Sequence, residues 1–382
     1  MAEPINIVGV VGAGVMGRGI AHLTARGGKQ TFLYDASAGM AAKAKTTILA
    51  GIEQRIESGK ATDAELSACT RNIVVVNDVA DLVPAELVIE AIIETLDGKT
   101  GLFRLLETVC SDNCLLTTNT SSLSVADIAR ALQKPQRFAG LHFFNPAIVM
   151  KLVEVVAGPS TDPATTRRLA DLVQSLGKTP VEVRDSPGFL VNRCARPFYG
   201  EALELLEEGV ADAATIDACL KSAGGFPLGP FELIDLVGID INLNATRAVW
   251  NAFGQAPRFK PSLLLADMVV QGRLGRKTGS GFFSYPREAT APVRQKSCNP
   301  DIFLRVAAMM ANEAAFAFQE GLASANAINT ALKLGLNFKH GPLDLARMIG
   351  VPAIIATLER CAKNNASGRY IICTALTEFA GQ

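Results

Sequence analysis

The stretch from Ile5 to Gly17, which reads INIVGVVGAGVMG, decides the fold of the first part of this chain. Its first half, Ile5–Val11, is an apolar, β-branched run, which is typical of a strand buried on both faces of a sheet. Gly12–Gly17 follows at once as the pattern GxGxxG, and helix-compatible sequence begins at Arg18. Such glycines permit a tight turn and let backbone N–H groups approach a pyrophosphate at a helix N-terminus. The stretch therefore predicts the start of a dinucleotide-binding domain.

A second predicted strand, Gln30–Asp35, ends in an acid that lies 23 residues after Gly12 (35 − 12). A carboxylate at this place can accept hydrogen bonds from both hydroxyls of an adenosine ribose, and it repels a 2′-phosphate. NAD is therefore the expected cofactor rather than NADP. The pattern GxGxxG alone is a weak signal, because a glycine-rich turn needs no ligand. Strand, glycines, helix, strand and acid in this order favour cofactor binding.

Further apolar runs are typical of strands, and helical patterns separate several of them, as βαβ units require. These runs are Ile73–Val76, Leu87–Ala91, Leu115–Thr118, Phe138–His142 and Val153–Val155. Residues 36–70 are rich in Ala, Lys and Glu and predict a long helical insertion after the second strand. Together these elements predict a Rossmann-type α/β domain over residues 1–186.

The composition of the 382 residues is that of an ordinary globular protein, with 49% apolar and 19% charged residues. The 37 Lys and Arg residues balance 37 Asp and Glu residues, so no basic field favours nucleic acid as a partner. No apolar run reaches the roughly 20 residues that a transmembrane helix needs, and we expect no contact with a membrane. The eight cysteines form no CxxC pair, which favours free thiols in a cytoplasmic protein without a metal site.

Three histidines are candidates for a general base: His22, His142 and His340. A dehydrogenase that acts on an alcohol needs a group to take the hydroxyl proton, and neutral imidazole does this near pH 7. His22 is expected to pack or face solvent within the first helix, and His340 lies in a turn. His142 ends a strand, where open α/β sheets bind their ligands. A single histidine at a strand end is more often structural, so its neighbours decide.

Those neighbours favour a site at His142. Glu154, 12 residues further on, could fix the imidazole tautomer and stabilise its charged form. Asn119–Leu123 (NTSSL) caps the preceding strand with short polar side chains, although Ser121 or Ser122 could merely cap the next helix. Phe143–Pro146 (FFNP) follows His142 and is expected to line a partly apolar mouth.

Eight segments between about residue 5 and residue 285 carry the clearest motifs of the chain. They are Val11–Gly17 (VGAGVMG), Glu90–Glu94 (EAIIE) with Lys99, Asn119–Leu123 (NTSSL), His142–Pro146 (HFFNP), Val153–Val155 (VEV), Pro187–Arg193 (PGFLVNR), Gly225–Leu233 (GFPLGPFEL) and Gly275–Phe282 (GRKTGSGF). In content, order and spacing they closely resemble the L-3-hydroxyacyl-CoA dehydrogenase family. The resemblance implies reversible, NAD-dependent oxidation of an (S)-3-hydroxyacyl-CoA to a 3-ketoacyl-CoA.

The resemblance also implies roles for single residues. His142 resembles the family's general base and Glu154 its partner. Ser121 and Asn192 resemble the polar groups that hold the substrate oxygens. The positions that the family places at the cofactor correspond to Gly12, Ala13, Gly14, Val15, Met16, Gly17, Asp35, Glu94, Lys99, Asn119, Ser121, Asn145 and Lys277.

Beyond residues 185–188 (DSPG), which punctuate the end of the first domain, apolar positions follow a helical period. The sequence from 301 onward repeats this region at a fixed offset of 112 residues (305 − 193). Matching pairs are Arg193 and Arg305, Glu201 and Glu313, Gly209 and Gly321, Ile216 and Ile328, Gly229-Pro230 and Gly341-Pro342, and Gly238 and Gly350. We predict two all-α helical domains, 187–285 and 299–382, joined by a linker near 286–300.

The second copy lacks the chemistry of the first, because Leu304 stands where Asn192 stands in the first copy, and no glycine-rich loop precedes it. We therefore expect the second copy to be structural. In single-copy members of the resembling family the helical domains pair between subunits, so we expect an internal pseudo-dimer here, with further homo-oligomerisation left open. No hydratase-like (crotonase) sequence precedes residue 1, and we expect the chain to lack the hydratase fused to multifunctional relatives.

Two alternative functions stay open at this point. The same architecture could oxidise a 3-hydroxy acid that carries no CoA, such as a sugar acid. A non-catalytic relative, as among crystallins, is disfavoured because His142, Glu154 and Asn192 are all present. The acyl chain length and the pathway stay undetermined. The basic residues between Lys43 and Lys60 could meet the CoA phosphates, but a solvated helix face is the favoured interpretation.

Overall fold

The computed structural model describes residues 4–285 and 299–380 and divides into two compact units, Met1–Asp185 and Ser186–Gln382. Most of the linker predicted near 286–300 lies outside the described residues. Within the described residues, no helix combines the length and the apolar character that crossing a membrane requires.

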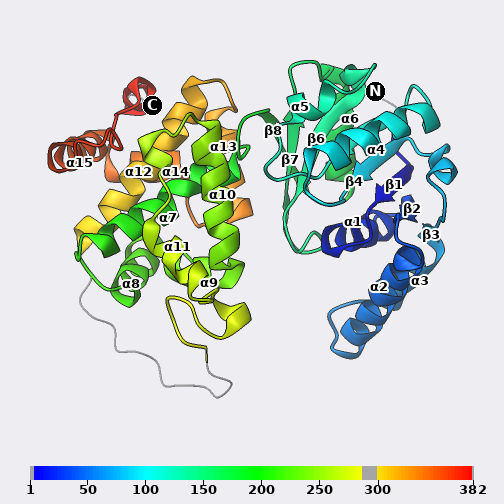
Figure 1. Ribbon diagram of the computed structural model, residues 1–382, viewed down its shortest axis with the longest axis horizontal. Coiled ribbons are helices and arrows are strands. Elements are labelled where there is room, and N and C mark those ends of the chain that lie inside the picture. The colour runs from blue at the N-terminus through cyan, green and yellow to red at the C-terminus, as the bar shows by residue number, and fades with distance from the viewer. Residues whose placement is uncertain (1–3, 286–298, 381–382) are drawn as a thin grey trace. The chain divides into compact units, whose positions relative to one another are not determined.

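The first unit is built on an eight-stranded sheet in the order β3-β2-β1-β4-β5-β6-β7-β8, with helices packed against it (Figure 1). Its strands are β1 Ile7–Val11, β2 Gln30–Tyr34, β3 Ile73–Val75, β4 Leu87–Glu90, β5 Leu115–Thr118, β6 Phe138–Phe143, β7 Leu152–Ala157 and β8 Thr179–Arg184. Its helices are α1 Val15–Arg26, α2 Met40–Glu57, α3 Asp63–Asn72, α4 Leu96–Val109, α5 Val125–Ala129 and α6 Pro163–Ser175, with 3-10 turns η1 Val79–Leu82 and η2 Pro135–Arg137. The predicted Rossmann-type α/β fold is confirmed.

Neighbouring strands of the sheet run parallel, except that β6 and β7 are antiparallel. The central strands read as continuous apolar runs because both of their faces are covered. Val8 and Val10 of β1 are fully buried, and they join a core with Ile20 of α1, Ile52 of α2 and Leu169 of α6. This core holds the glycine turn and the carboxyl ends of the strands in fixed positions.

Two features of the first unit add to the sequence-based expectation. Strand β8 was not predicted, because its sequence TPVEVR contains a proline and alternates buried with exposed residues, as an edge strand does. The helical insertion predicted for residues 36–70 is present, and it consists of two helices, α2 and α3. Gly59 adopts a φ of 69° after α2, and the Thr62 side chain then caps α3 by accepting a hydrogen bond from the Glu65 N–H.

The second unit is helical, as predicted. Its helices are α7 Val191–Glu207, α8 Ala213–Gly224, α9 Pro230–Val237, α10 Ile239–Ala252, α11 Leu263–Val270, α12 Pro300–Gln319, α13 Ala325–Gly335, α14 Pro342–Ile349 and α15 Val351–Asn364, with η3 Pro257–Phe259, η4 Arg276–Thr278 and η5 Thr374–Ala380. Adding 112 to the last residues of α7, α9 and α10 (207, 237 and 252) gives the last residues of α12, α14 and α15 (319, 349 and 364). The helices therefore follow the sequence repeat, although both stretches belong to one compact unit. Separate domains at 187–285 and 299–382 stay a prediction.

Helices α7 and α12, which correspond to one another in the repeat, pack together through reciprocal ion pairs. Arg193 of α7 donates from Nε to Glu313 Oε1 at 2.7 Å, and Arg305 of α12 donates from Nε to Glu201 Oε1 at 2.5 Å. Glu201 and Glu313 also correspond to one another in the repeat, so each arginine pairs with the glutamate of the other copy. This is the pattern of an isologous contact, here within one chain.

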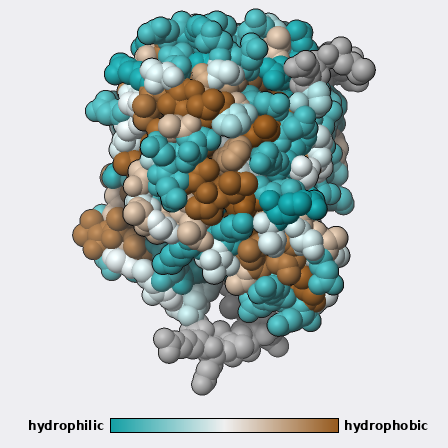
Figure 2. Space-filling view, turned by 90° about the vertical axis from the view of Figure 1, so that its right-hand side faces the viewer, coloured by the Kyte–Doolittle hydropathy of each residue, from teal (hydrophilic) through white to brown (hydrophobic). Residues whose placement is uncertain are grey.

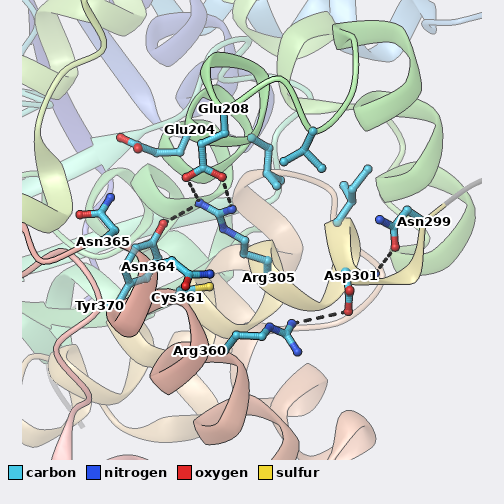
Figure 3. A pocket seen from close by; sticks show the side chains of 13 residues that line it. Glu204, Glu208, Asn299, Asp301, Arg305, Arg360, Cys361, Asn364, Asn365 and Tyr370 are labelled. Carbon is cyan, nitrogen blue, oxygen red and sulfur yellow. Dashed lines mark hydrogen bonds and ion pairs between the residues drawn. The ribbon is translucent and has the colours of Figure 1, made fainter.

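The surroundings of the two arginines are not equivalent. Arg305 donates a hydrogen bond from Nη2 to Tyr370 Oη at 2.7 Å and lines a cavity of about 530 Å³ (Figure 3). Arg193 is fully buried, with its guanidinium carbon 4.7 Å from the centre of the Phe253 ring. The two copies have thus diverged around a shared pattern of charges.

Deletion of residues 299–382 is expected to expose the apolar face of α7 and to cause aggregation or new dimerisation. It also removes Arg305 and Arg369 from Glu201, which is fully buried, and a buried carboxylate without its partners is strongly destabilising. Size-exclusion chromatography with light scattering, run beside the full chain, measures the effect. A truncated chain that stays a soluble, stable monomer would contradict the expectation.

Candidate active site

The turn between β1 and α1 is shaped by its glycines. Gly12 has a φ of 104°, and a Cβ there would lie 2.5 Å from the carbonyl oxygen of Ala91. A Cβ on Gly17 would lie 1.7 Å from the Gly12 oxygen, so these two glycines are needed for packing. A Cβ on Gly14 would meet nothing within 4 Å, so that side of the turn is open. The open side lies at the N-terminus of α1, where a pyrophosphate fits.

Asp35 lies directly beside this turn. Its Oδ2 accepts a hydrogen bond from the Ala13 N–H at 2.7 Å, and its Oδ1 accepts one from the Ser37 N–H at 2.8 Å. The residue is half-buried, so its carboxylate keeps an exposed side. The end of the second strand and the first turn thus form one cradle, which suits a ribose and a pyrophosphate of one dinucleotide.

His142 and Glu154 form a buried pair at the carboxyl end of β6. The antiparallel register sets the two residues opposite one another, and His142 Nδ1 lies 2.6 Å from Glu154 Oε2. Both side chains are buried, and the ring of Phe144 covers the imidazole at a centroid distance of 4.5 Å. A carboxylate on Nδ1 fixes the tautomer that carries a proton there, so Nε2 is the nitrogen that can accept a proton from a ligand.

Glu94 organises the polar segment that follows β5. Its Oε1 accepts hydrogen bonds from Thr120 Oγ1 at 2.5 Å, from the Ser121 N–H at 3.1 Å and from Ser122 Oγ at 2.9 Å. Burial raises the pKa of Glu94, but the hydrogen bond from Thr120, the charge of Lys99 and the bond from Ser122 outweigh it and lower the pKa below its ordinary value. The ionised carboxylate therefore holds this segment in place.

The alternative that Ser121 or Ser122 caps the next helix is wrong. The N-cap of α5 is Ser124, whose side chain accepts a hydrogen bond from the Asp127 N–H. Ser121 and Ser122 are both exposed on the segment that Glu94 holds. Ser121 is therefore exposed at the carboxyl end of the sheet, whereas the Ser122 hydroxyl is bound to Glu94.

Lys99 is buried behind this segment. Its Nζ lies 2.5 Å from Glu90 Oε1 and 3.2 Å from Glu94 Oε2. Glu90 is fully buried and also accepts hydrogen bonds from the Ile92 N–H at 2.7 Å and Thr118 Oγ1 at 2.6 Å. The ammonium of Lys99 is thus engaged by two carboxylates, so it acts on the site through Glu94.

Glu90 was not among the predicted site residues. Its only signal in the sequence is a charged residue at the end of an apolar strand, in the segment EAIIE. A buried charge is stable only when it is paired and hydrogen-bonded, and the partners of this one lie on α4, on β5 and in the loop after β4. Reasoning along the sequence could not name those partners.

The two predicted asparagines of the first unit take different positions. Asn119 is half-buried, and its Oδ1 accepts a hydrogen bond from the N–H of Phe143, the residue after His142, at 2.9 Å. It therefore ties the end of β5 to the end of β6. Asn145 is exposed in the loop beyond β6, where a cis peptide bond joins it to Pro146.

Lys178 holds the loop between β6 and β7, and this loop exposes the apolar side chain of Val149. Lys178 Nζ donates hydrogen bonds to the carbonyl oxygens of Ile148 at 3.1 Å and Met150 at 2.7 Å.

Hydrophobic patches on one face of the molecule are interrupted by hydrophilic surface (Figure 2). Three exposed apolar side chains follow the carboxyl ends of β1, β4 and β6: Val15 (61% exposed), Ile93 (72%) and Val149 (66%). An apolar rim of this kind favours a site from which water can be excluded.

The remaining predicted residues belong to the second unit. Asn192 is the second residue of α7, and its carbonyl oxygen accepts a hydrogen bond from Arg196 Nε at 2.9 Å. Lys277 lies 2.5 Å from Asp240 Oδ1 through its Nζ.

His22 is structural. Its Nε2 lies 2.8 Å from Glu65 Oε1, and the pair joins α1 to α3 inside the first unit. Burial lowers the pKa of His22 in spite of the neighbouring carboxylate, so the ring is held neutral near pH 7. Of the two expectations for this residue, packing is the correct one.

Comparison with protein families gives two matching descriptions. The NAD binding domain of 3-hydroxyacyl-CoA dehydrogenase matches residues 7–186. The C-terminal domain of 3-hydroxyacyl-CoA dehydrogenase matches twice, at residues 188–285 and 302–380. The first match covers the unit that holds the glycine turn, and the second covers both helical stretches.

Similar proteins agree with these matches. A 3-hydroxyadipyl-CoA dehydrogenase of Escherichia coli is 36% identical, with 98% of each chain covered. A crystal structure of a 3-hydroxybutyryl-CoA dehydrogenase of Escherichia coli is 36% identical with a TM-score of 0.93, and covers 99% of this chain and 98% of that one. A probable 3-hydroxybutyryl-CoA dehydrogenase of Bacillus subtilis is 36% identical over 75% of this chain and 99% of its own.

Proposed function

The chain belongs to the 3-hydroxyacyl-CoA dehydrogenase family of NAD-dependent oxidoreductases, and we propose that it interconverts an (S)-3-hydroxyacyl-CoA and the 3-ketoacyl-CoA. The observation that carries the proposal is the buried pair of His142 and Glu154, 2.6 Å apart. It lies at the carboxyl edge of the sheet, the edge that also carries the glycine turn. Open α/β sheets bind their ligands at this edge.

His142 acts as the general base in this proposal. Its Nε2 accepts the proton of the substrate's 3-hydroxyl group, and Glu154 stabilises the imidazolium that results. Bound NAD supplies the acceptor for the hydride that leaves C3. In the reverse direction the imidazolium of His142 stabilises negative charge on the C3 oxygen and then returns the proton.

The other predicted site residues position the reactants. We assign Ser121 and Asn192 to the substrate oxygens, and Asn119, Asn145 and Lys277 to the cofactor. The turn Gly12–Gly17 and Asp35 would hold the pyrophosphate and the adenosine ribose. Glu94 would contact the cofactor side of the site, and Lys99 would support it from behind. The hydrogen bonds that Glu94 accepts from residues 120–122 support this division of roles.

The substrate is proposed to be a CoA thioester, because the relatives carry names of CoA thioester dehydrogenases. Their names specify both a dicarboxylic acyl group, 3-hydroxyadipyl, and a short one, 3-hydroxybutyryl. Initial rates of NADH oxidation with a series of 3-ketoacyl-CoA esters, one with a distal carboxylate, decide between these. Turnover is expected with thioesters. Turnover of free 3-hydroxy acids alone would instead support the alternative without CoA.

The two helical copies are proposed to pair as the helical domains of two subunits would. The reciprocal pairs Arg193–Glu313 and Arg305–Glu201 support this internal pseudo-dimer. We also propose a cytoplasmic location for this chain, whereas a 39% identical relative of Sus scrofa is named as mitochondrial.

His142→Gln is expected to lower kcat by a factor on the order of 10²–10⁴, the usual effect of losing a general base. The dissociation constant for NADH should change little, because the glycine turn is untouched. Stopped-flow or steady-state reduction of acetoacetyl-CoA gives kcat, and NADH fluorescence gives binding. His22→Gln is a matched control, since His22 also pairs with a glutamate in the first unit but should keep kcat. A near-normal rate for His142→Gln would remove this residue from its role.

Asp35→Ser is expected to weaken NADH binding and to relax discrimination against NADPH. Loss of hydrogen bonds to a charged group, about 1.5–3 kcal/mol, corresponds to roughly 10- to 100-fold weaker binding. Titration with NADH and NADPH measures both effects. Asp63→Ser, an exposed acid of α3, serves as the control. Unchanged NADH affinity in the Asp35 variant would refute the ribose contact.

A further inference from the structure

The first turn of α7 carries Asn192, and no side chain caps this helix. The N-cap residue, Leu190, has an apolar side chain that cannot accept a hydrogen bond. The chain enters the helix through two residues with left-handed backbone, Gly188 (φ 75°) and Phe189 (φ 48°). A non-glycine residue in that region is strained, so surrounding contacts must hold the segment in place.

The corresponding turn of α12 is built differently. This helix begins at Pro300, the repeat-mate of position 188 (300 − 112), so it starts three residues earlier than α7 does at 191. Its N-cap, Asn299, accepts a hydrogen bond from the Asp301 N–H. Arg305 is therefore the sixth residue of a capped helix, whereas Arg193 is the third residue of α7.

Contacts from α12 hold the residue that follows Asn192. Arg193, next to Asn192 in the chain, is fully buried and donates from Nε to Glu313 Oε1 at 2.7 Å. Its Nη1 and Nη2 donate to Glu320 Oε2 at 2.6 Å and to Glu320 Oε1 at 2.9 Å. A planar guanidinium bound by such a fork has one orientation, and a buried side chain has no room for another.

We infer that Glu313 and Glu320, both in the second helical copy, are positioning residues that act on Asn192 through Arg193. This inference rests on the proposed role of Asn192 in holding the substrate. The copy without an active-site asparagine thus completes the turn that carries the asparagine of the other copy. A misplacement of about 1 Å in such a turn is enough to slow a reaction that depends on substrate alignment.

The repeat itself provides the control for a test. Glu208 is the repeat-mate of Glu320 (208 + 112) and forms the equivalent fork, with Arg305 Nη1 at 2.5 Å and Nη2 at 2.8 Å. The two carboxylate side chains are similarly exposed, 39% for Glu208 and 45% for Glu320. Arg305 follows Leu304, which cannot hold a substrate oxygen. Glu208→Gln therefore makes the same chemical change without a consequence for Asn192.

The test compares Glu320→Gln with Glu208→Gln in the full chain. Glu320→Gln is expected to lower kcat/KM for acetoacetyl-CoA by a factor on the order of 10. We expect both a lower kcat and a higher KM for the thioester. Its dissociation constant for NADH should equal that of the unaltered chain, since the glycine turn belongs to the other unit. Glu208→Gln should show the kinetics of the unaltered chain. Equal kinetics in the two variants, whether both normal or both reduced, would overturn the inference.

Amide hydrogen exchange provides a second readout that needs no turnover. Glu320→Gln is expected to speed exchange at residues 191–194, whereas Glu208→Gln should leave residues 303–306 protected by their capped helix. Unchanged exchange at 191–194 in Glu320→Gln would also overturn the inference. A full chain that reduces no 3-ketoacyl-CoA would instead refute the proposed function, and the exchange comparison would still decide whether α12 holds the turn.

Discussion

The antiparallel pairing of β6 with β7 is the constraint on which the candidate site depends. The other neighbouring strands of the sheet are parallel. If β7 were parallel to β6, a long crossover connection would have to separate the two strands, and with it His142 from its partner, along the chain. The reversal sets His142 opposite Glu154 within 12 positions of the chain. Burial of both side chains strengthens their interaction and fixes the ring nitrogen that we propose faces the substrate.

Buried charge serves the same purpose elsewhere in the molecule. The pair of Glu90 and Lys99 lies behind the segment after β5, and Arg193 with Glu313 lies behind the first turn of α7. Such pairs add little net stability, because removing two charges from water costs several kcal/mol per ion. What they add is one defined geometry, which polar contacts of fixed direction give and apolar packing does not. Both pairs lie directly behind residues that we assign to the substrate or the cofactor.

In our proposal the two helical copies have different roles: the first carries Asn192, and the second supports the turn in which Asn192 lies. In the first copy α7 begins late and through strained backbone, which leaves the half-buried Asn192 in its first turn. In the second copy α12 begins earlier and with a side-chain cap, and we infer that it supports the first turn of α7. Divergence after duplication thus explains why the charges repeat at an offset of 112 residues whereas the asparagine does not.

The sequence by itself determined the elements whose signals are local. The run Ile5–Gly17, the acid at Asp35 and the 112-residue repeat predict the α/β unit, its dinucleotide cradle and the helical part, because periodicity and turn residues act within one element. The tertiary structure alone decided the partners: edge strand β8, Glu90 behind Lys99, and Glu320 on Arg193 across 127 positions. The physical reason is that a buried charge is satisfied by whichever group the fold brings to it, and that group leaves no periodic trace near it in the chain.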